Sequence, residues 1–135
     1  MALTASLDTN VLARLLVQDD ILQTQAALTL LAQYVQRSET LFVPVSVWLE
    51  LAWVLRSCYK FGKADVILAL SSLLATVELI FESEEALEQS LVNYEEGHAD
   101  YADCLHLALA HHSHALPFLT FDVCASRSKG ARLVT

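Results

Sequence analysis

The stretch that decides the fold is Leu3-Thr4-Ala5-Ser6-Leu7-Asp8-Thr9-Asn10-Val11-Leu12. Its first half, from Leu3 to Leu7, is short and mostly apolar, which predicts a buried strand that ends at Asp8. From Asn10 to Leu16 the apolar residues recur at helical spacing. The chain therefore begins with a strand, a turn and a helix, the unit from which α/β proteins are built.

The rest of the sequence repeats this alternation. Asp19 or Asp20 is the expected cap of a helix over 21–37. Its apolar stripe is expected to contain Leu28, Leu31, Ala32 and Val35. Ser46 is the expected cap of a helix over 47–59 that is buried on more than one side, and Ser83 is the expected cap of the acidic helix over 84–96. Further helices are predicted over 63–75, 84–96 and 101–112, and further strands over 41–44, 77–81, 117–121 and 132–134.

Alternating strands and helices indicate a parallel sheet whose crossovers are right-handed and whose two faces are covered by helices. The expected class is α/β, and 135 residues fit one domain over 1–135. Ligands of such sheets bind beyond the carboxyl ends of the strands. Residues that directly follow a strand are therefore the first candidates for function.

The composition restricts the class of protein further. A hydrophobic fraction of 55% with two prolines excludes a disordered chain. No apolar run reaches the roughly 18 residues of a membrane span, and the start lacks a basic signal segment, so we expect a cytoplasmic protein without a membrane partner. Cys58, Cys104 and Cys124 form no C-x-x-C pair, which argues against a disulfide framework or a zinc site.

The net charge of −8 argues against nucleic-acid binding through the overall field of the protein. The charge is uneven, however, because glutamates are dense between 82 and 96 while Arg127, Lys129 and Arg132 lie near the C-terminus. A locally basic rim for phosphates is compatible with this distribution, although solvated surface charge is the more common explanation for any single Lys or Arg.

Acidic residues follow two of the predicted strands. Asp8 comes after the first strand, and Asp122 comes after the strand over 117–121. Parallel strands would deliver both side chains to one edge of a sheet. Each aspartate also has a simpler explanation, because aspartate often caps the turn or helix that follows.

Two more acids stand in apolar surroundings. Glu50 is the one charged residue of 45–55, where an ionised carboxylate risks a burial cost of several kcal/mol unless it is paired or bound to a metal. An exposed strip of that helix would remove the cost. Asp103 is flanked by apolar residues near the start of the helix over 101–112, and Asp100 is placed to cap this helix.

Carboxylates that converge at one edge repel one another and raise each other's pKa, and a bound cation relieves this repulsion. Ligands that are all carboxylate oxygens favour Mg²⁺ or Mn²⁺ over zinc. The sequence thus predicts a divalent-metal site.

The sequence resembles the PIN-domain family, in particular the VapC-like toxin ribonucleases of bacterial toxin–antitoxin pairs. The resemblance rests on four motifs that together cover almost the whole chain, namely 7–12, 44–51, 100–108 and 119–122. It implies a three-layer fold with a central parallel sheet of four to five strands. It also implies hydrolysis of RNA with Mg²⁺ or Mn²⁺, a homodimer, and inhibition by an antitoxin protein.

The resemblance implies specific roles for residues of this sequence. Its catalytic and metal-binding acids would be Asp8, Glu50, Asp103 and Asp122, with Asp100 as an accessory metal ligand. Its polar supports would be Thr9, Asn10, Ser46 and Thr120, and its contacts to substrate phosphates would be Arg14, Arg127 and Lys129.

Two other functions fit part of the pattern. Asp8 could be the nucleophile of a phosphatase that forms an aspartyl-phosphate, although Asn10 stands where such enzymes carry a second acid. A non-catalytic interaction module of the same fold would not need the four acids that this sequence has. His106, His111, His112 and His114 lack the spacing of a metal tract and suit the C-terminal end of a helix.

Overall fold

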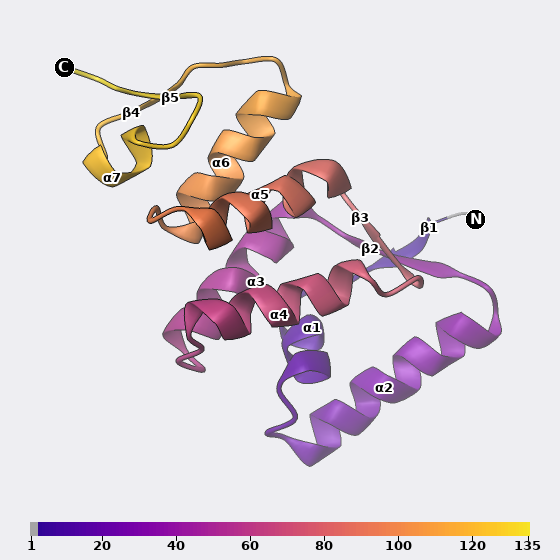
Figure 1. Cartoon of the computed structure of the whole chain (residues 1–135). Coiled ribbons are helices and arrows are strands. Elements are labelled where there is room, and N and C mark those ends of the chain that lie inside the picture. Colours follow the sequence, from indigo (N-terminus) through magenta and orange to yellow (C-terminus); the bar gives the residue numbers. More distant parts are fainter. Residues whose placement is uncertain (1–2) are drawn as a thin grey trace. The chain divides into compact units, whose positions relative to one another are not determined.

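The computed structural model describes residues 3–135. They form two compact units, one that ends at Glu82 and one over Ser83–Thr135. Both units combine helices with parallel strands (Figure 1). The predicted α/β class is confirmed.

The first unit contains a parallel sheet in the order β1-β2-β3. Its strands are β1 (Leu3–Ser6), β2 (Thr40–Val43) and β3 (Leu79–Phe81), connected through helices α1 (Thr9–Leu16) and α2 (Ile21–Gln36) and then α3 (Val45–Ser57) and α4 (Lys63–Leu74). Ser6 is in register with Phe42, and Val43 is in register with Phe81. The carboxyl ends of the three strands therefore lie at one edge, where Asp8 and Glu82 follow their strands.

The core of this unit gathers under α3. Trp48, Leu51 and Leu55 of this helix are fully buried, and Leu41 and Val43 of β2 are nearly or fully buried as well. The Trp48 ring meets the Phe81 ring edge-on, with 5.4 Å between the ring centroids. Burial of each large apolar side chain contributes about 1.5–3 kcal/mol, so this cluster holds the sheet and the helix together.

The second unit is a helix pair followed by a small parallel sheet. Helices α5 (Glu84–Glu96) and α6 (Tyr101–His112) precede β4 (Phe118–Thr120), the short α7 (Val123–Ser126) and β5 (Ala131–Leu133). Helices α5 and α6 pack against each other, Leu87 and Leu105 of these helices are fully buried, and the buried Ser90 and Tyr101 hydroxyls lie 2.7 Å apart. Phe118 is in register with Ala131. Helix α7 was not expected from the sequence.

The arrangement of the strands corrects one expectation. We expected one central sheet of four to five strands, whereas the described strands form a three-stranded sheet in the first unit and a two-stranded sheet in the second. The three-layer arrangement and the single domain over 1–135 stay predictions. Among the described residues, no helix combines the length and the apolar character needed to cross a membrane.

Two helix starts differ from the prediction. Ser46 is not the cap of α3, because Pro44 occupies the N-cap position and the helix begins at Val45. The Val45 N–H donates to the Glu82 carboxylate at 2.7 Å. A side chain distant in the sequence therefore accepts a hydrogen bond from the first turn of α3, as Ser46 was expected to do. Ser83 does occupy the N-cap position of α5, but in a left-handed conformation and without a side-chain hydrogen bond to the helix.

Two predicted burial patterns were wrong. On α2 the side chains of Leu28, Ala32 and Val35 are exposed, and Thr24 and Ala27 are the buried ones. The smaller side chains face inward because α2 packs closely on α1. The predicted burial of α3 on more than one side also fails, since this helix buries a single stripe and leaves Trp53 62% exposed.

Candidate active site

Asp8 lies just beyond β1 and is exposed. It is the N-cap of α1, and one oxygen of its carboxylate accepts a hydrogen bond of 2.7 Å from the Thr9 N–H. Asp8 therefore has the simple capping role. The hydrogen bond from the Thr9 N–H uses one carboxylate oxygen and holds the Asp8 side chain at the carboxyl edge of the sheet, where a ligand of an α/β protein is expected.

Glu50 lies in the middle of α3, and its side chain is exposed. The sequence argument from the cost of burying this carboxylate was therefore wrong. The apolar residues around it belong to the buried stripe of Trp48, Leu51 and Leu55, and Glu50 lies outside that stripe. Helix α3 packs against α1, the helix that Asp8 caps, so both predicted acids of the first unit lie on packed elements.

Glu82 is an acid at the sheet edge that the sequence analysis missed. It follows β3 as Asp8 follows β1, and its N–H donates to the Val43 carbonyl at 3.1 Å. Its carboxylate accepts from the Val45 N–H at 2.7 Å. The same signal, an acid directly after a strand, would have found it. Through this hydrogen bond, Glu82 holds the start of α3 next to the end of β3.

The second unit contains the other three predicted acids. Asp100 is the N-cap residue of α6, although its carboxylate makes no capping hydrogen bond. Asp103 lies in the first turn of the same helix and is half-buried. Asp122 is the N-cap of α7, and its carboxylate accepts from the Ala125 N–H at 2.8 Å. Two helix starts thus direct acids into one region of this unit.

The pKa of Asp103 shows that these acids influence one another. Burial raises the pKa of Asp103 most, the charges of Asp122 and then Asp100 raise it further, and His106 lowers it in part. The net direction is upward from the ordinary value of 3.8. Asp103 thus retains its proton to a higher pH than a surface aspartate, and a cation beside it would offset the repulsion from Asp122 and Asp100.

The four predicted polar supports lie next to the acids in different ways. The Thr120 hydroxyl oxygen accepts from the Asp122 N–H at 3.0 Å, which fixes the turn between β4 and α7. Thr9 is 2% exposed, and its hydroxyl has no hydrogen-bond partner among the described residues. Asn10 and Ser46 are exposed residues in the first turns of α1 and α3.

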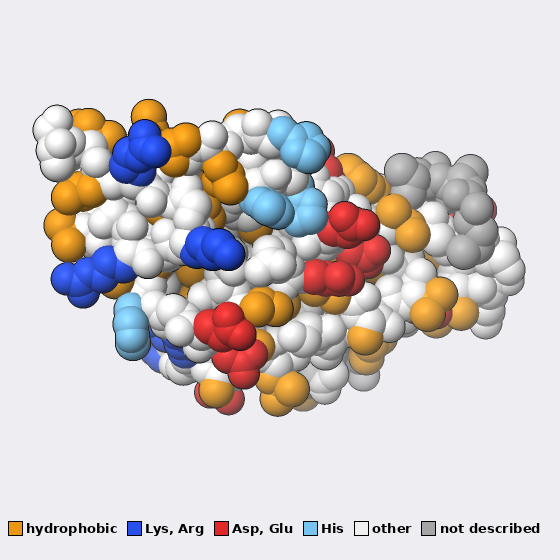
Figure 2. All heavy atoms as spheres, turned by 45° about the horizontal axis from the view of Figure 1, so that its top comes forward, with side chains coloured by type: hydrophobic (Ala, Val, Ile, Leu, Met, Phe, Trp, Pro, Cys, Tyr) orange, Lys and Arg blue, Asp and Glu red, His pale blue; other side chains and the backbone are white. Residues whose placement is uncertain are grey.

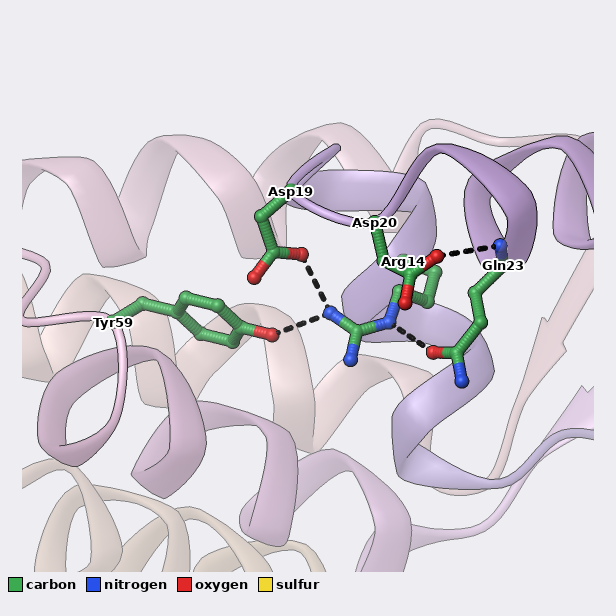
Figure 3. A network of polar contacts seen from close by, with 5 residues as sticks. All are labelled: Arg14, Asp19, Asp20, Gln23 and Tyr59. Atoms are coloured by element: carbon green, nitrogen blue, oxygen red, sulfur yellow. Dashed lines mark hydrogen bonds and ion pairs between the residues drawn. The ribbon is translucent and has the colours of Figure 1, made fainter.

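Arg14 is held in a network of its own (Figure 3). Its guanidinium donates to Gln23 Oε1 at 2.6 Å, to Asp19 Oδ1 at 2.6 Å and to the Tyr59 hydroxyl at 2.8 Å. Burial lowers the pKa of Arg14, but Tyr59 and the acids Asp19 and Asp20 raise it, and the net direction is upward. These contacts give Arg14 a structural task that the sequence did not reveal.

Arg127 and Lys129 are exposed at the end of α7 and in the loop that follows it. Both line a cavity of about 350 Å³ in the second unit. In Figure 2 the side chains of Lys and Arg gather at the left end of the face drawn, where Figure 1 has α7 and β5. The locally basic region expected near the C-terminus is present.

The structure therefore groups the predicted acids as Asp8 and Glu50 in the first unit and as Asp100, Asp103 and Asp122 in the second. Neither unit alone, over the described residues, presents three or more His, Cys, Asp or Glu side chains arranged around a common metal position. The donors themselves are carboxylate oxygens, the ligands that Mg²⁺ and Mn²⁺ prefer. Their chemistry fits a divalent cation, and the mutual repulsion at Asp103 gives a reason to bind one.

Comparison with known proteins adds one finding. The family model of the PIN domain matches residues 5–127, which cover most of both units and all the predicted acids. No curated protein matches the chain closely enough to count as a relative.

Proposed function

Since this chain belongs to the PIN domain family, whose members are generally nucleases, we propose that it is a divalent-metal-dependent ribonuclease. The reaction is hydrolysis of an RNA phosphodiester bond by in-line attack of water. The finer proposal is that the chain is a VapC-like toxin that acts as a homodimer and is inhibited by a cognate antitoxin protein.

One observation carries the proposal most directly. Asp103 has a raised pKa because it is partly buried and because Asp122 and Asp100 repel its charge. Repulsion between like charges costs stability, so its presence among Asp103, Asp122 and Asp100 indicates that the protein uses these acids. Phosphoryl transfer needs such acids as cation ligands, whereas an interaction module of the same fold does not.

The acids Asp8, Glu50, Asp103 and Asp122 would hold Mg²⁺ or Mn²⁺, with Asp100 as an accessory ligand. When bound, the cation supplies Lewis acidity toward a phosphoryl oxygen and the attacking water. The chain itself orients the acids, because the Thr9 N–H holds the carboxylate of Asp8 and the Ala125 N–H holds that of Asp122. Thr120 fixes the backbone at Asp122, and Arg127 and Lys129 are available to phosphate oxygens.

The test is cleavage of a pool of structured RNAs with and without Mn²⁺. The wild-type chain is compared with Asp8→Asn and Asp103→Asn, one from each unit, and with Asp65→Asn, an exposed aspartate on α4 outside the proposed site. We expect cleavage to require the cation and to fall about a hundredfold or more in both site variants, as expected when a group that stabilises the transition state is lost. Asp65→Asn should cleave like the wild type.

A contaminating nuclease would survive all three substitutions, and that result would remove the evidence for the proposal. Hydrolysis of a small phosphate ester without RNA cleavage, lost in Asp8→Asn, would replace the proposal with the phosphatase. The toxin role is tested separately by expression in a bacterial host. Growth should stop on induction of the wild type and continue with Asp103→Asn, and equal growth with both would refute the toxin role alone.

A further inference from the structure

The cavity of about 350 Å³ in the second unit lies apart from the carboxylates discussed above. It is lined by the end of α5, by Gly97 and His98 that follow this helix, by the α7 region and by Leu107 of α6. Its volume falls in the range of small-molecule sites, which are commonly about 300–1,000 Å³. Its polar groups come from two sides that differ in character.

One side of the cavity is cationic. Arg127 and Lys129 are two of the three Lys and Arg residues between Ser83 and Thr135, a segment that holds eight Asp and Glu residues. No ion pair joins either cation to a carboxylate within the described part of the chain. Two uncompensated cations in an acidic unit suit an oxyanion such as phosphate.

The other side offers a carboxylate acceptor and a side-chain amide. Glu96 contributes a carboxylate, and the C-terminal end of α5 contributes a partial negative charge. Asn93 already accepts a hydrogen bond of 2.9 Å from Gln89 through its side-chain oxygen, so its amide retains two N–H donors. Glu96 and the two cations line the same cavity without pairing with one another.

A ligand that satisfies both sides must combine an anion with a group that donates hydrogen bonds. Nucleotides have this combination. A carboxylate accepts through two adjacent oxygens, and guanine is the RNA base whose Watson–Crick edge presents two adjacent donors, N1–H and the N2 amino group. The neighbouring O6 of guanine would accept from the Asn93 amide.

We propose that this cavity binds one guanine nucleotide, with its phosphate on Arg127 and Lys129 and its base edge on Glu96 and Asn93. Helix α7 links this cavity to the proposed active site, because Asp122 is its N-cap and Arg127 its C-cap. The helical rise separates these two residues by about 7.5 Å. The cavity is therefore a specificity subsite for a guanosine next to the cleaved bond, and this last step rests on the proposed ribonuclease function.

Binding is tested without metal and without RNA cleavage. Guanosine 5′-monophosphate, cytidine 5′-monophosphate, guanosine and inorganic phosphate are titrated into the ¹⁵N-labelled full chain, and amide shifts are followed. We expect the guanine nucleotide to bind about tenfold tighter than the cytosine nucleotide, since a bidentate contact to a base discriminates by about 1–3 kcal/mol. The largest shifts should fall on Asn93, Glu96, Arg127 and Lys129.

Matched variants separate the two sides of the cavity. Lys129→Gln should weaken both nucleotides and inorganic phosphate several-fold, whereas Arg132→Gln, an exposed cation of β5 that does not line the cavity, should leave all affinities unchanged. Glu96→Gln should abolish the preference for guanine and keep phosphate binding, whereas Glu95→Gln, its exposed neighbour, should keep both. Equal effects of variant and control, or phosphate binding without discrimination between bases, would overturn the proposal.

Cysteine alkylation gives a second, local readout. Cys124 lines the cavity, and the exposed Cys58 lies in the first unit as an internal control. Bound guanosine 5′-monophosphate should slow iodoacetamide labelling of Cys124 and leave Cys58 unchanged, as measured by peptide mass spectrometry. Equal labelling of Cys124 with and without saturating nucleotide would place the ligand elsewhere.

The result is distinguishable from a failure of the ribonuclease proposal. If the chain binds the nucleotide but cleaves no RNA, the cavity stands and the catalytic proposal falls. If it cleaves RNA with the same sequence preference in the wild type and in Glu96→Gln, the catalytic proposal stands and the subsite falls.

Discussion

The charge of Asp122, at the start of α7, raises the pKa of Asp103 in α6 beyond the larger increase that burial causes. The two residues belong to different helices, and β4 lies between them in the sequence. Their interaction shows, without reference to any relative, that acids from two helix starts of the second unit influence one another. The titration of Asp103 alone therefore reports on this influence.

The first prediction concerns that titration. Asp122→Asn should lower the pKa of Asp103, because it removes a repelling charge, and His106→Gln should raise it, because His106 lowers the pKa in the native chain. Carboxyl ¹³C shifts of Asp103 followed against pH measure both changes. Glu88→Gln, on the exposed surface of α5, serves as the control and should not move the titration. A shift of the same sign in both site variants would contradict the electrostatic explanation.

The second prediction concerns stability against pH. The folded state retains the Asp103 proton to a higher pH than the unfolded state, whose pKa is close to 3.8. Asp103 therefore stabilises the fold below that pH, and the contribution is lost as the pH rises through its raised pKa in the folded state. In metal-free urea unfolding, the wild type should lose stability relative to Asp103→Asn across this window. A constant difference between the two proteins from pH 3 to pH 7 would refute the prediction.

The third prediction concerns the cation. If the acids bind Mn²⁺ in the folded state alone, the cation stabilises the chain by about 2.7 kcal/mol at a concentration about a hundred times its dissociation constant. Thermal unfolding should therefore shift upward with Mn²⁺ in the wild type, and the shift should shrink in Asp103→Asn. Removal of the cation with a chelator should reverse it. Equal shifts in wild type and Asp103→Asn would assign the effect to another site.

The fourth prediction separates Glu82 from the catalytic acids. Glu82→Ala removes the acceptor of the Val45 N–H and should cost about 0.5–2 kcal/mol of unfolding free energy, as the loss of a helix cap does. Glu82→Gln retains an oxygen acceptor and should recover part of that stability. RNA cleavage per folded molecule should be unchanged in Glu82→Gln. Loss of cleavage at full stability would instead make Glu82 a member of the site.

The fifth prediction tests the structural role of Arg14. Tyr59→Phe removes one of its hydrogen bonds and should cost about 0.5–1.5 kcal/mol in urea unfolding, the typical worth of such a bond. The same variant should leave RNA binding and its salt dependence unchanged, because the network lies among Asp19, Gln23 and Tyr59. If Tyr59→Phe weakens RNA binding without a loss of stability, Arg14 contacts the substrate after all.

Features that depend on residues close together in the sequence were predicted, whereas features that depend on distant residues were not. The starts of α1, α2 and α7 depend on an aspartate next to the helix that follows, and the first two helices were predicted to within one residue. The start of α3 was not, because its first N–H donates to the side chain of Glu82, which lies just beyond β3 and far from α3 in the sequence. Glu50 was misread for a related reason, since an apolar stretch does not reveal which side of its helix faces the core.

The sequence alone determined the alternation of strands and helices, the α/β class and the resemblance to the family whose model matches residues 5–127. These features follow from local spacing and from residues that stand next to one another in the chain. The division of the strands between two sheets, the capping role of Glu82, the network around Arg14 and the repulsion between Asp103 and Asp122 were decided by tertiary structure. Each of these features joins groups that are distant in the sequence. A local sequence pattern does not show how close such groups come in the folded chain.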